Sequence, residues 1–192
     1  MTPSKEELRR RLRAEALLHP PEERVADSEL ICTAIERQPA WQSTRSVLFF
    51  WPIGVEPDLR PICLKALQAG KIAALPKYLP ETGDYGGFQV TDVERQLVPG
   101  RYGVVEPDGS CARFDLNKLD LIFVPGLGFS FDGVRLGRGK GYYDRLLADL
   151  PAIKCGVAYD WQIVAEIPRE AHDVRMDCVV TPQAWHEVAR QS

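Results

Sequence analysis

The sequence predicts an α/β fold in which helices cover both faces of a largely parallel sheet. Short continuous apolar runs, typical of buried strands, recur between residues 46 and 181. Segments with helical spacing of apolar residues lie between them, and this alternation favours parallel strands joined by helices. A chain of 192 residues fits one domain, so we expect a single domain over residues 1–192.

A basic helix is expected at the start of the chain. Ser4 and Glu7 have the spacing of a capping box, and Leu8 and Leu12 lie on one face. The basic residues of this helix are Lys5, Arg9, Arg10, Arg11 and Arg13. A second helix is expected to begin near Pro21, because proline is tolerated in a first turn. The residues expected to face the core from this helix are Val25, Ile31, Ala34 and Ile35.

Strands and helices alternate through the rest of the chain. Strands are expected at 46–51, 71–76, 119–125, 153–159 and 177–181. Helices are expected at 57–70, with Gly70 at the C-cap, at 143–150, and at 182–191 as the closing element. Residues 80–112 contain many glycines, prolines and charges, and we expect loops and short strands there, such as 87–90.

Composition and charge exclude several classes of protein. A net charge of −3 argues against a general nucleic-acid or membrane binder. The five cysteines form no C-x-x-C pair, so we expect reduced, mostly buried thiols. The N-terminal segment lacks an apolar signal core, and the apolar runs are too short to cross a bilayer. We therefore expect a soluble cytoplasmic protein.

A glycine-rich segment follows the apolar run 119–125 and has the chemistry of a phosphate-binding loop. Glycines let backbone N–H groups approach an anion, and a following helix N-terminus adds favourable charge. Its full charges are Arg135, Arg138 and Lys140. Neither standard motif fits, since a P-loop fails at Val134 and Gly141 and a dinucleotide fingerprint fails at Tyr142. The alternative is a structural turn with solvated charges.

The run VPGLGFSFDGVRLGRGKGYYDRLL, residues 124–147, resembles the signature of the 5-formyltetrahydrofolate cyclo-ligase family, also called methenyltetrahydrofolate synthetases. The resemblance extends over nearly the whole chain. Further matching segments are K-x-x-L-R at 5–9, FFWPIGVEPD at 49–58, YGVVEP at 102–107 and HDVRMD at 172–177. The fold that this resemblance implies is a Rossmann-like α/β domain.

The implied activity is the ATP- and Mg²⁺-dependent cyclisation of 5-formyltetrahydrofolate to 5,10-methenyltetrahydrofolate, with release of ADP and phosphate. In the family mechanism the formyl oxygen attacks the γ-phosphate and gives an iminium phosphate, which nitrogen 10 then attacks. Phosphoryl transfer requires mainly positioning and charge neutralisation. The expected ligands are small molecules, without nucleic acid or membrane, and the chain is expected to be a monomer or a weak homo-oligomer.

The resemblance also assigns residues to ATP. Lys5 and Arg9 lie on one helical face, four residues apart, and are implied to reach the nucleotide. The remaining expected ATP-binding residues are Arg135, Leu136, Gly137, Arg138, Gly139, Lys140, Gly141, Tyr142 and Tyr143. The groups expected to act in catalysis are Arg138, Lys140 and Tyr143. Without the resemblance, a solvated surface would be the ordinary interpretation of the basic helix.

Metal and folate sites are implied in the same way. Mg²⁺ prefers hard oxygen ligands, and Asp144 and Asp173 are the expected ligands, with Asp177 as a weaker alternative. Asp144 has a second interpretation as a helix cap, and His172 is expected to be structural. The residues expected to contact folate are Glu56, Tyr102 and Tyr143. Glu56 would accept hydrogen bonds from the pterin edge, although a solvated loop carboxylate is the alternative.

Two other functions remain open at this point. A sugar-phosphate isomerase or a relative of the CoA-transferases would share the Rossmann-like architecture. A non-catalytic regulator or RNA-binding protein would use the basic helix and the glycine loop as a charged surface. Folate-dependent hydrolysis of ATP would separate both from the cyclo-ligase.

Overall fold

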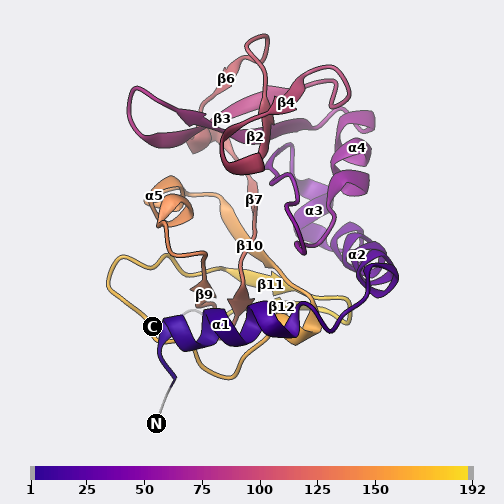
Figure 1. The fold of residues 1–192 in the computed structure, drawn as a ribbon. Helices are drawn as coiled ribbons and strands as arrows, with labels where there is room; N and C mark the ends of the chain where they lie inside the picture. Colours follow the sequence, from indigo (N-terminus) through magenta and orange to yellow (C-terminus); the bar gives the residue numbers. More distant parts are fainter. Residues whose placement is uncertain (1–2, 190–192) are drawn as a thin grey trace.

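The structure is a computed structural model that describes residues 3–189, apart from the side chain of Tyr102. Within that part of the chain, eight strands form the main sheet (Figure 1). In spatial order they are β12 (Trp185–Glu187), β11 (Cys178–Val180), β10 (Ile153–Val157), β7 (Leu121–Val124), β1 (Ser46–Leu48), β2 (Ile72–Leu79), β3 (Asp84–Val90) and β6 (Arg113–Phe114).

The centre of this sheet is parallel. Strands β2, β1, β7, β10 and β11 run in the same direction, in the register Leu48↔Ile122 between β1 and β7. Strands β3, β6 and β12 are antiparallel to their neighbours and lie at the two sides. Two small sheets pair β4 (Leu97–Pro99) with β5 (Val105–Pro107), and β8 (Gly128–Phe129) with β9 (Arg135–Leu136). The predicted largely parallel α/β sheet is confirmed.

Five α-helices surround the sheet among the described residues. They are α1 (Lys5–Glu15), α2 (Pro21–Glu36), α3 (Pro39–Ser43), α4 (Arg60–Gln68) and α5 (Tyr142–Leu147). Three short 3₁₀ turns are η1 (Arg101–Gly103), η2 (Leu116–Lys118) and η3 (Asp160–Gln162). Gly70 adopts the left-handed conformation just after α4, as expected of a glycine that ends a helix.

Helices cover both faces of the sheet, as predicted. Side chains alternate along each buried strand, so apolar side chains point to both faces and both need a covering layer. Val47 and Phe123 pack on one face with residues of α2, α3 and α4. Leu48 and Ile122 point to the opposite face and pack with Leu146 and other residues of α5. Figure 1 shows α2, α3 and α4 together on one side of the strands and α5 on the other.

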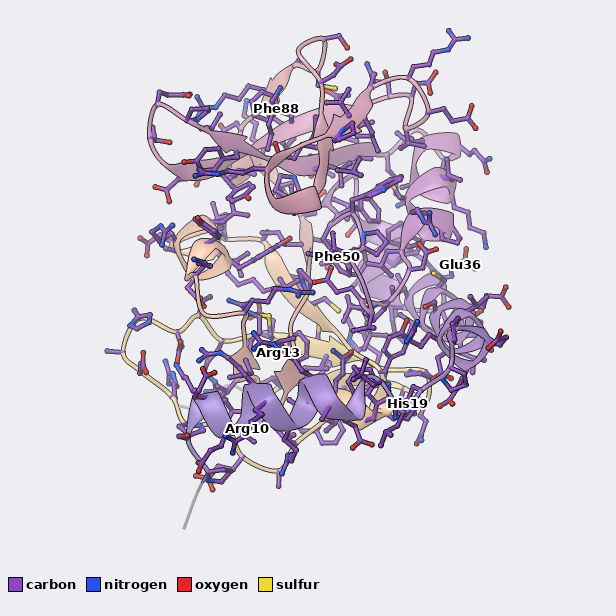
Figure 2. All side chains as sticks on the ribbon, viewed as in Figure 1. Arg10, Arg13, His19, Glu36, Phe50 and Phe88 are labelled. Carbon is purple, nitrogen blue, oxygen red and sulfur yellow. The ribbon has the colours of Figure 1, made fainter. Side chains whose placement is uncertain are left out.

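Helix α1 packs against a separate small cluster beside the main sheet. The predicted capping box is confirmed, since the Ser4 hydroxyl accepts from the Glu7 amide and the Glu7 carboxylate accepts from the Ser4 amide. Leu8 and Leu12 are buried against Leu136 and its neighbours. The opposite face of α1 carries the exposed Arg10 and Arg13, labelled in Figure 2. Burial of one leucine face thus fixes which basic residues of α1 turn inward.

The predicted closing helix over 182–191 is wrong. Trp185–Glu187 form the strand β12, antiparallel to β11 in the register Val180↔Trp185, and residues 190–192 of that segment lie outside the described part of the chain. The local preference for a helix is weak, and the hydrogen bonds between β12 and β11 outweigh it. Without β12, backbone N–H and C=O groups of β11 would lack partners. The Trp185 side chain also packs against the main core, an interaction that helical periodicity does not reveal.

Two smaller expectations also differ from the structure. Helix α5 ends at Leu147, not at 150, because Ala148 has a non-helical ψ of 131° and Asp149 then takes a left-handed backbone conformation. Val25 was expected in the core, but 60% of its surface is exposed, whereas Ile31 and Ile35 are buried as predicted. In residues 3–189 no helix is both long enough and apolar enough to span a membrane.

Candidate active site

A cavity of about 750 Å³ opens at the carboxyl ends of the central strands. Much of its lining comes from segments far apart in the sequence: the start of α1, the loop after β1, the stretch from 135 to 144, and the segment 170–173. Phe50, labelled in Figure 2, is buried directly after β1 and forms part of the wall. Ligands of open parallel sheets bind at this edge, because the loops after the strands converge there.

The glycine loop between β9 and α5 has a backbone that requires glycine. Gly139 and Gly141 have positive φ angles of 97° and 65°, which other residues adopt only with strain. A Cβ atom at Gly137 would lie 2.8 Å from Nη1 of Arg135. The Nε of Arg9 donates to the Gly137 carbonyl at 3.0 Å, so α1 holds this loop in place. The loop therefore presents its backbone to the cavity without side chains at three positions.

Arg135 lies beneath this loop and is almost completely buried, with 5% of its side chain exposed. Its Nη2 lies 2.8 Å from Oδ2 of Asp144, and its Nη1 donates to the Pro125 carbonyl at 3.4 Å. The guanidinium also lies 5.6 Å from the ring centre of Tyr143. Its Nε is buried and has no hydrogen-bond partner among the described residues. Arg135 thus joins β9 to α5 and keeps one donor available.

Arg138 forms an ion pair across the cavity with Glu56, in the loop after β1. The distance from Arg138 Nη2 to Glu56 Oε1 is 2.8 Å, and Glu56 Oε2 accepts from the Ile53 amide at 3.1 Å. Only 7% of the Glu56 side chain is exposed, against 46% for Arg138. Burial raises the pKa of Glu56 above its ordinary value, and the bonds from Arg138 and Ile53 offset only part of this effect.

Lys5 pairs with two acidic residues of the segment 170–173 in the cavity. Its Nζ lies 2.6 Å from Oδ2 of Asp173 and 3.5 Å from Oε1 of Glu170. Burial raises the pKa of Asp173, but the hydrogen bonds from Lys5 and the Glu170 amide outweigh it, and the net pKa lies below its ordinary value. Potential ligand atoms of Glu170, His172 and Asp173 lie within 4.8 Å of one another.

Aromatic rings complete the walls of the cavity. Tyr142 packs edge-on against Tyr85 with ring centres 5.3 Å apart, and Tyr143 lies over Arg135. Burial, with the nearby charge of Glu56, raises the pKa of Tyr143 well above its ordinary value, so its hydroxyl stays protonated at neutral pH.

The model of the 5-formyltetrahydrofolate cyclo-ligase family matches residues 1–182. The chain belongs to this family. The mouse 5-formyltetrahydrofolate cyclo-ligase is 31% identical over 185 residues, which cover 91% of this chain and 89% of the mouse protein. The Escherichia coli K12 cyclo-ligase is 30% identical, over 86% of this chain and 93% of its own.

A solved structure agrees with these sequence relatives. The NMR structure of Aquifex aeolicus 5,10-methenyltetrahydrofolate synthetase is similar with a TM-score of 0.87 and 32% identity. The similarity covers 98% of this chain and 94% of that chain. The resemblance to the cyclo-ligase family and the implied α/β fold are thereby confirmed.

In this cyclo-ligase family member, most residues that the sequence assigned to the site line the same cavity. Lining residues among them are Lys5, Arg9, Glu56, Arg135, Leu136, Gly137, Arg138, Gly139, Lys140, Gly141, Tyr142, Tyr143, Asp144 and Asp173. The side chain of Tyr102 lies outside the described part of the chain, although its backbone belongs to η1. Asp177 is not among the lining residues, and its Oδ2 accepts from the Lys154 amide at 2.8 Å, at the amino end of β11.

Tyr85 and Glu170 are among the lining residues of this cyclo-ligase site that sequence reasoning missed. Tyr85 lies on β3, in a stretch that we expected to be mostly loop, so no pattern pointed to it. Glu170 comes two residues before His172. It could have been identified from the sequence as part of the same acidic segment. His172, expected to be structural, is an exposed member of the Glu170 group.

Proposed function

We propose that this chain catalyses the ATP-dependent cyclisation of 5-formyltetrahydrofolate to 5,10-methenyltetrahydrofolate, with release of ADP and phosphate. One observation carries the proposal: a glycine loop with basic residues and a buried carboxylate face the same cavity. The loop suits a polyphosphate, and the carboxylate suits the N–H donors of a pterin. The names of the relatives include the folate substrate or product.

The proposed reaction forms and breaks bonds in two stages. The formyl oxygen attacks the γ-phosphorus, and the bond from that phosphorus to the ADP oxygen breaks. Nitrogen 10 then attacks the activated formyl carbon, the carbon–oxygen bond breaks, and the proton lost from nitrogen 10 leaves with the released phosphate. Lys140, Arg138 and the loop amides would neutralise charge on the transferred group. The protonated Tyr143 would donate a hydrogen bond within the same cavity.

Basic residues of α1 would complete the nucleotide site. Lys5 and Arg9 both line the cavity, and each is held by a neighbour, Lys5 by Asp173 and Arg9 by the Gly137 carbonyl. Charges that are already oriented cost little ordering entropy when a phosphate binds. The helix would therefore contribute oriented charge to the site.

The carboxylates in the cavity fit Mg²⁺ as the proposed cofactor. Asp144 and Asp173 each bind a basic side chain through Oδ2, which leaves a second oxygen on each carboxylate. Such hard oxygens, few in number, are the ligands that Mg²⁺ takes beside phosphate groups. When bound, the ion would supply positive charge to the phosphates.

We include in the proposal a single domain over 1–192, a cytoplasmic location, small-molecule ligands only, and a monomer or weak homo-oligomer.

The activity itself is the first prediction. Purified protein mixed with (6S)-5-formyltetrahydrofolate and MgATP is expected to form the methenyl product, one ADP and one phosphate per turnover. Absorbance in the methenyl band follows the product, and coupled assays follow ADP and phosphate. Release of AMP, or the absence of product with pure substrate, would contradict the proposed function.

The second prediction concerns Lys140, whose exposed side chain extends from the glycine loop. Lys140→Ala is expected to lower kcat/KM for MgATP by at least ~10-fold, because a charge-assisted phosphate contact contributes roughly 1.5–3 kcal/mol. Arg10→Ala is the matched control, because it removes one exposed positive charge on the outer face of α1. Equal kinetics in the two variants would show that Lys140 is merely solvated.

A further inference from the structure

The ion pair between Arg138 and Glu56 joins two parts of the cavity that we assign to different ligands. Arg138 belongs to the glycine loop, proposed to bind phosphate, and Glu56 belongs to the loop after β1, proposed to bind the pterin. The distance of 2.8 Å between Nη2 and Oε1 is that of a direct charge-assisted hydrogen bond. Arg138 thus binds the carboxylate that the pterin is expected to bind, and Glu56 binds the guanidinium that phosphate is expected to bind.

The two partners differ in their freedom to leave this pair. Almost half of the Arg138 side chain is exposed, so the guanidinium can turn toward another anion and remain solvated. Glu56 is buried, and its Oε2 is held by the Ile53 amide, so the carboxylate stays in place. A phosphate that attracts Arg138 therefore leaves a buried, unpaired carboxylate behind. Such a group is unfavourable until another donor reaches it.

We propose that the Arg138–Glu56 ion pair couples the binding of the two substrates, so that each is bound more tightly when the other is present. The proposal rests on the proposed function. With ATP alone, Arg138 turns to the phosphates and the Glu56 carboxylate lacks a cationic partner. With both ligands, the N–H donors of the pterin replace Arg138 at Glu56. The unfavourable free energy of breaking the pair is then shared by the two binding events, because the pair is broken only once.

The same reasoning fixes the effect in the reverse direction. A pterin that donates to Glu56 reduces the need for Arg138 there, and the guanidinium becomes available to phosphate. Thermodynamic linkage requires that the two effects be equal as ratios of dissociation constants. Arg138 therefore acts on folate binding as a positioning residue, through Glu56, in addition to its contact with phosphate.

Calorimetric titration of the full chain tests this coupling. The probes are (6S)-5-formyltetrahydrofolate and the Mg²⁺ complex of the unreactive analogue in which nitrogen bridges the β- and γ-phosphates. In the unaltered protein, the Kd of each is expected to fall roughly 5- to 150-fold when the other is saturating, the usual range for such coupling. The two ratios are expected to agree.

Two matched variants separate the ion pair from other sources of coupling. Arg138→Met and Lys140→Met each remove one positive charge from the same loop and keep most of the apolar stem. In Arg138→Met the coupling ratio is expected to fall to about 1, because no pair remains to be broken. In Lys140→Met nucleotide binding is expected to weaken while the coupling ratio stays at the value of the unaltered protein, because Lys140 has no such partner at Glu56.

Each alternative result overturns a specific statement. A ratio near 1 in the unaltered protein, with both ligands binding and the methenyl product forming, would overturn the coupling and leave the proposed function intact. A ratio that survives in Arg138→Met would assign the coupling to direct contact between the ligands and remove the ion pair from it. No binding of 5-formyltetrahydrofolate by the unaltered protein would overturn the proposed function together with the coupling.

Discussion

Arg135→Met is expected to lower the free energy of unfolding by about 3–5 kcal/mol, the range for breaking one partner out of a buried ion pair. The change leaves Asp144, whose side chain is only 15% exposed, without its cation, and also removes the donor to the Pro125 carbonyl. Unfolding in urea, followed by circular dichroism, measures the loss. The methionine fills most of the volume, so the effect reports the polar contacts.

Arg145→Met is the matched control for this experiment. Arg145 lies on α5, after the glycine loop, and pairs with Asp84 at 2.6 Å, but about half of each side chain is exposed. Exposed pairs contribute about 0–1 kcal/mol, so this variant is expected to remain close to the unaltered protein. Similar unfolding midpoints for the Arg135 and Arg145 variants would show that the buried contacts of Arg135 contribute little to stability.

Glu56→Gln is expected to weaken the binding of 5-formyltetrahydrofolate by roughly 5- to 150-fold. The amide keeps the volume but places a donor where the pterin offers donors, and such a mismatch in a desolvated site contributes about 1–3 kcal/mol. Calorimetric titration without nucleotide measures the change. Affinity for the nucleotide analogue alone is expected not to fall, because the amide no longer holds Arg138.

The stability of this variant distinguishes a binding effect from misfolding. Burial raises the pKa of Glu56, so above that pKa the ionised carboxylate is a net cost to the fold, and stability falls as the pH rises through it. The neutral amide does not carry this cost, so Glu56→Gln is expected to unfold at the same or a higher temperature at neutral pH. Glu106→Gln, a second buried glutamate outside the cavity lining, is expected to leave folate affinity unchanged. Unchanged folate binding in Glu56→Gln would instead favour a structural role.

The parts of the fold that depend on local pattern could be predicted from the sequence. Leu8 and Leu12 marked the buried face of α1, and the apolar run around Ile122 marked a strand buried on both faces. The last strand was missed, because Trp185 belongs to β12 through its pairing with Val180 across a hairpin, which helical periodicity does not reveal. The left-handed backbone of Asp149, which shortens α5, likewise had no sequence signal.

Prediction of the candidate site had a similar limit. The sequence assigned Arg138 and Glu56 to two different ligands, and both line the cavity. It did not reveal that they bind each other, since 82 residues separate them and each has its own ordinary explanation. Arg135 was expected to contact phosphate, which stays a prediction; its hydrogen bonds to Pro125 and Asp144 depend on folding and had no sequence signal.

The two antiparallel strands at the sides of the main sheet have a consequence for contacts between molecules. Strands β6 and β12 are only two and three residues long. An outermost strand presents backbone groups that can hydrogen-bond to a strand of another chain, and short outer strands are one way in which proteins limit such growth. The parallel strands, which are rich in valine, isoleucine and leucine, all lie inside this order and have neighbours on both sides. The aggregation-prone part of the sequence is therefore kept away from other copies of the chain for as long as the sheet is intact.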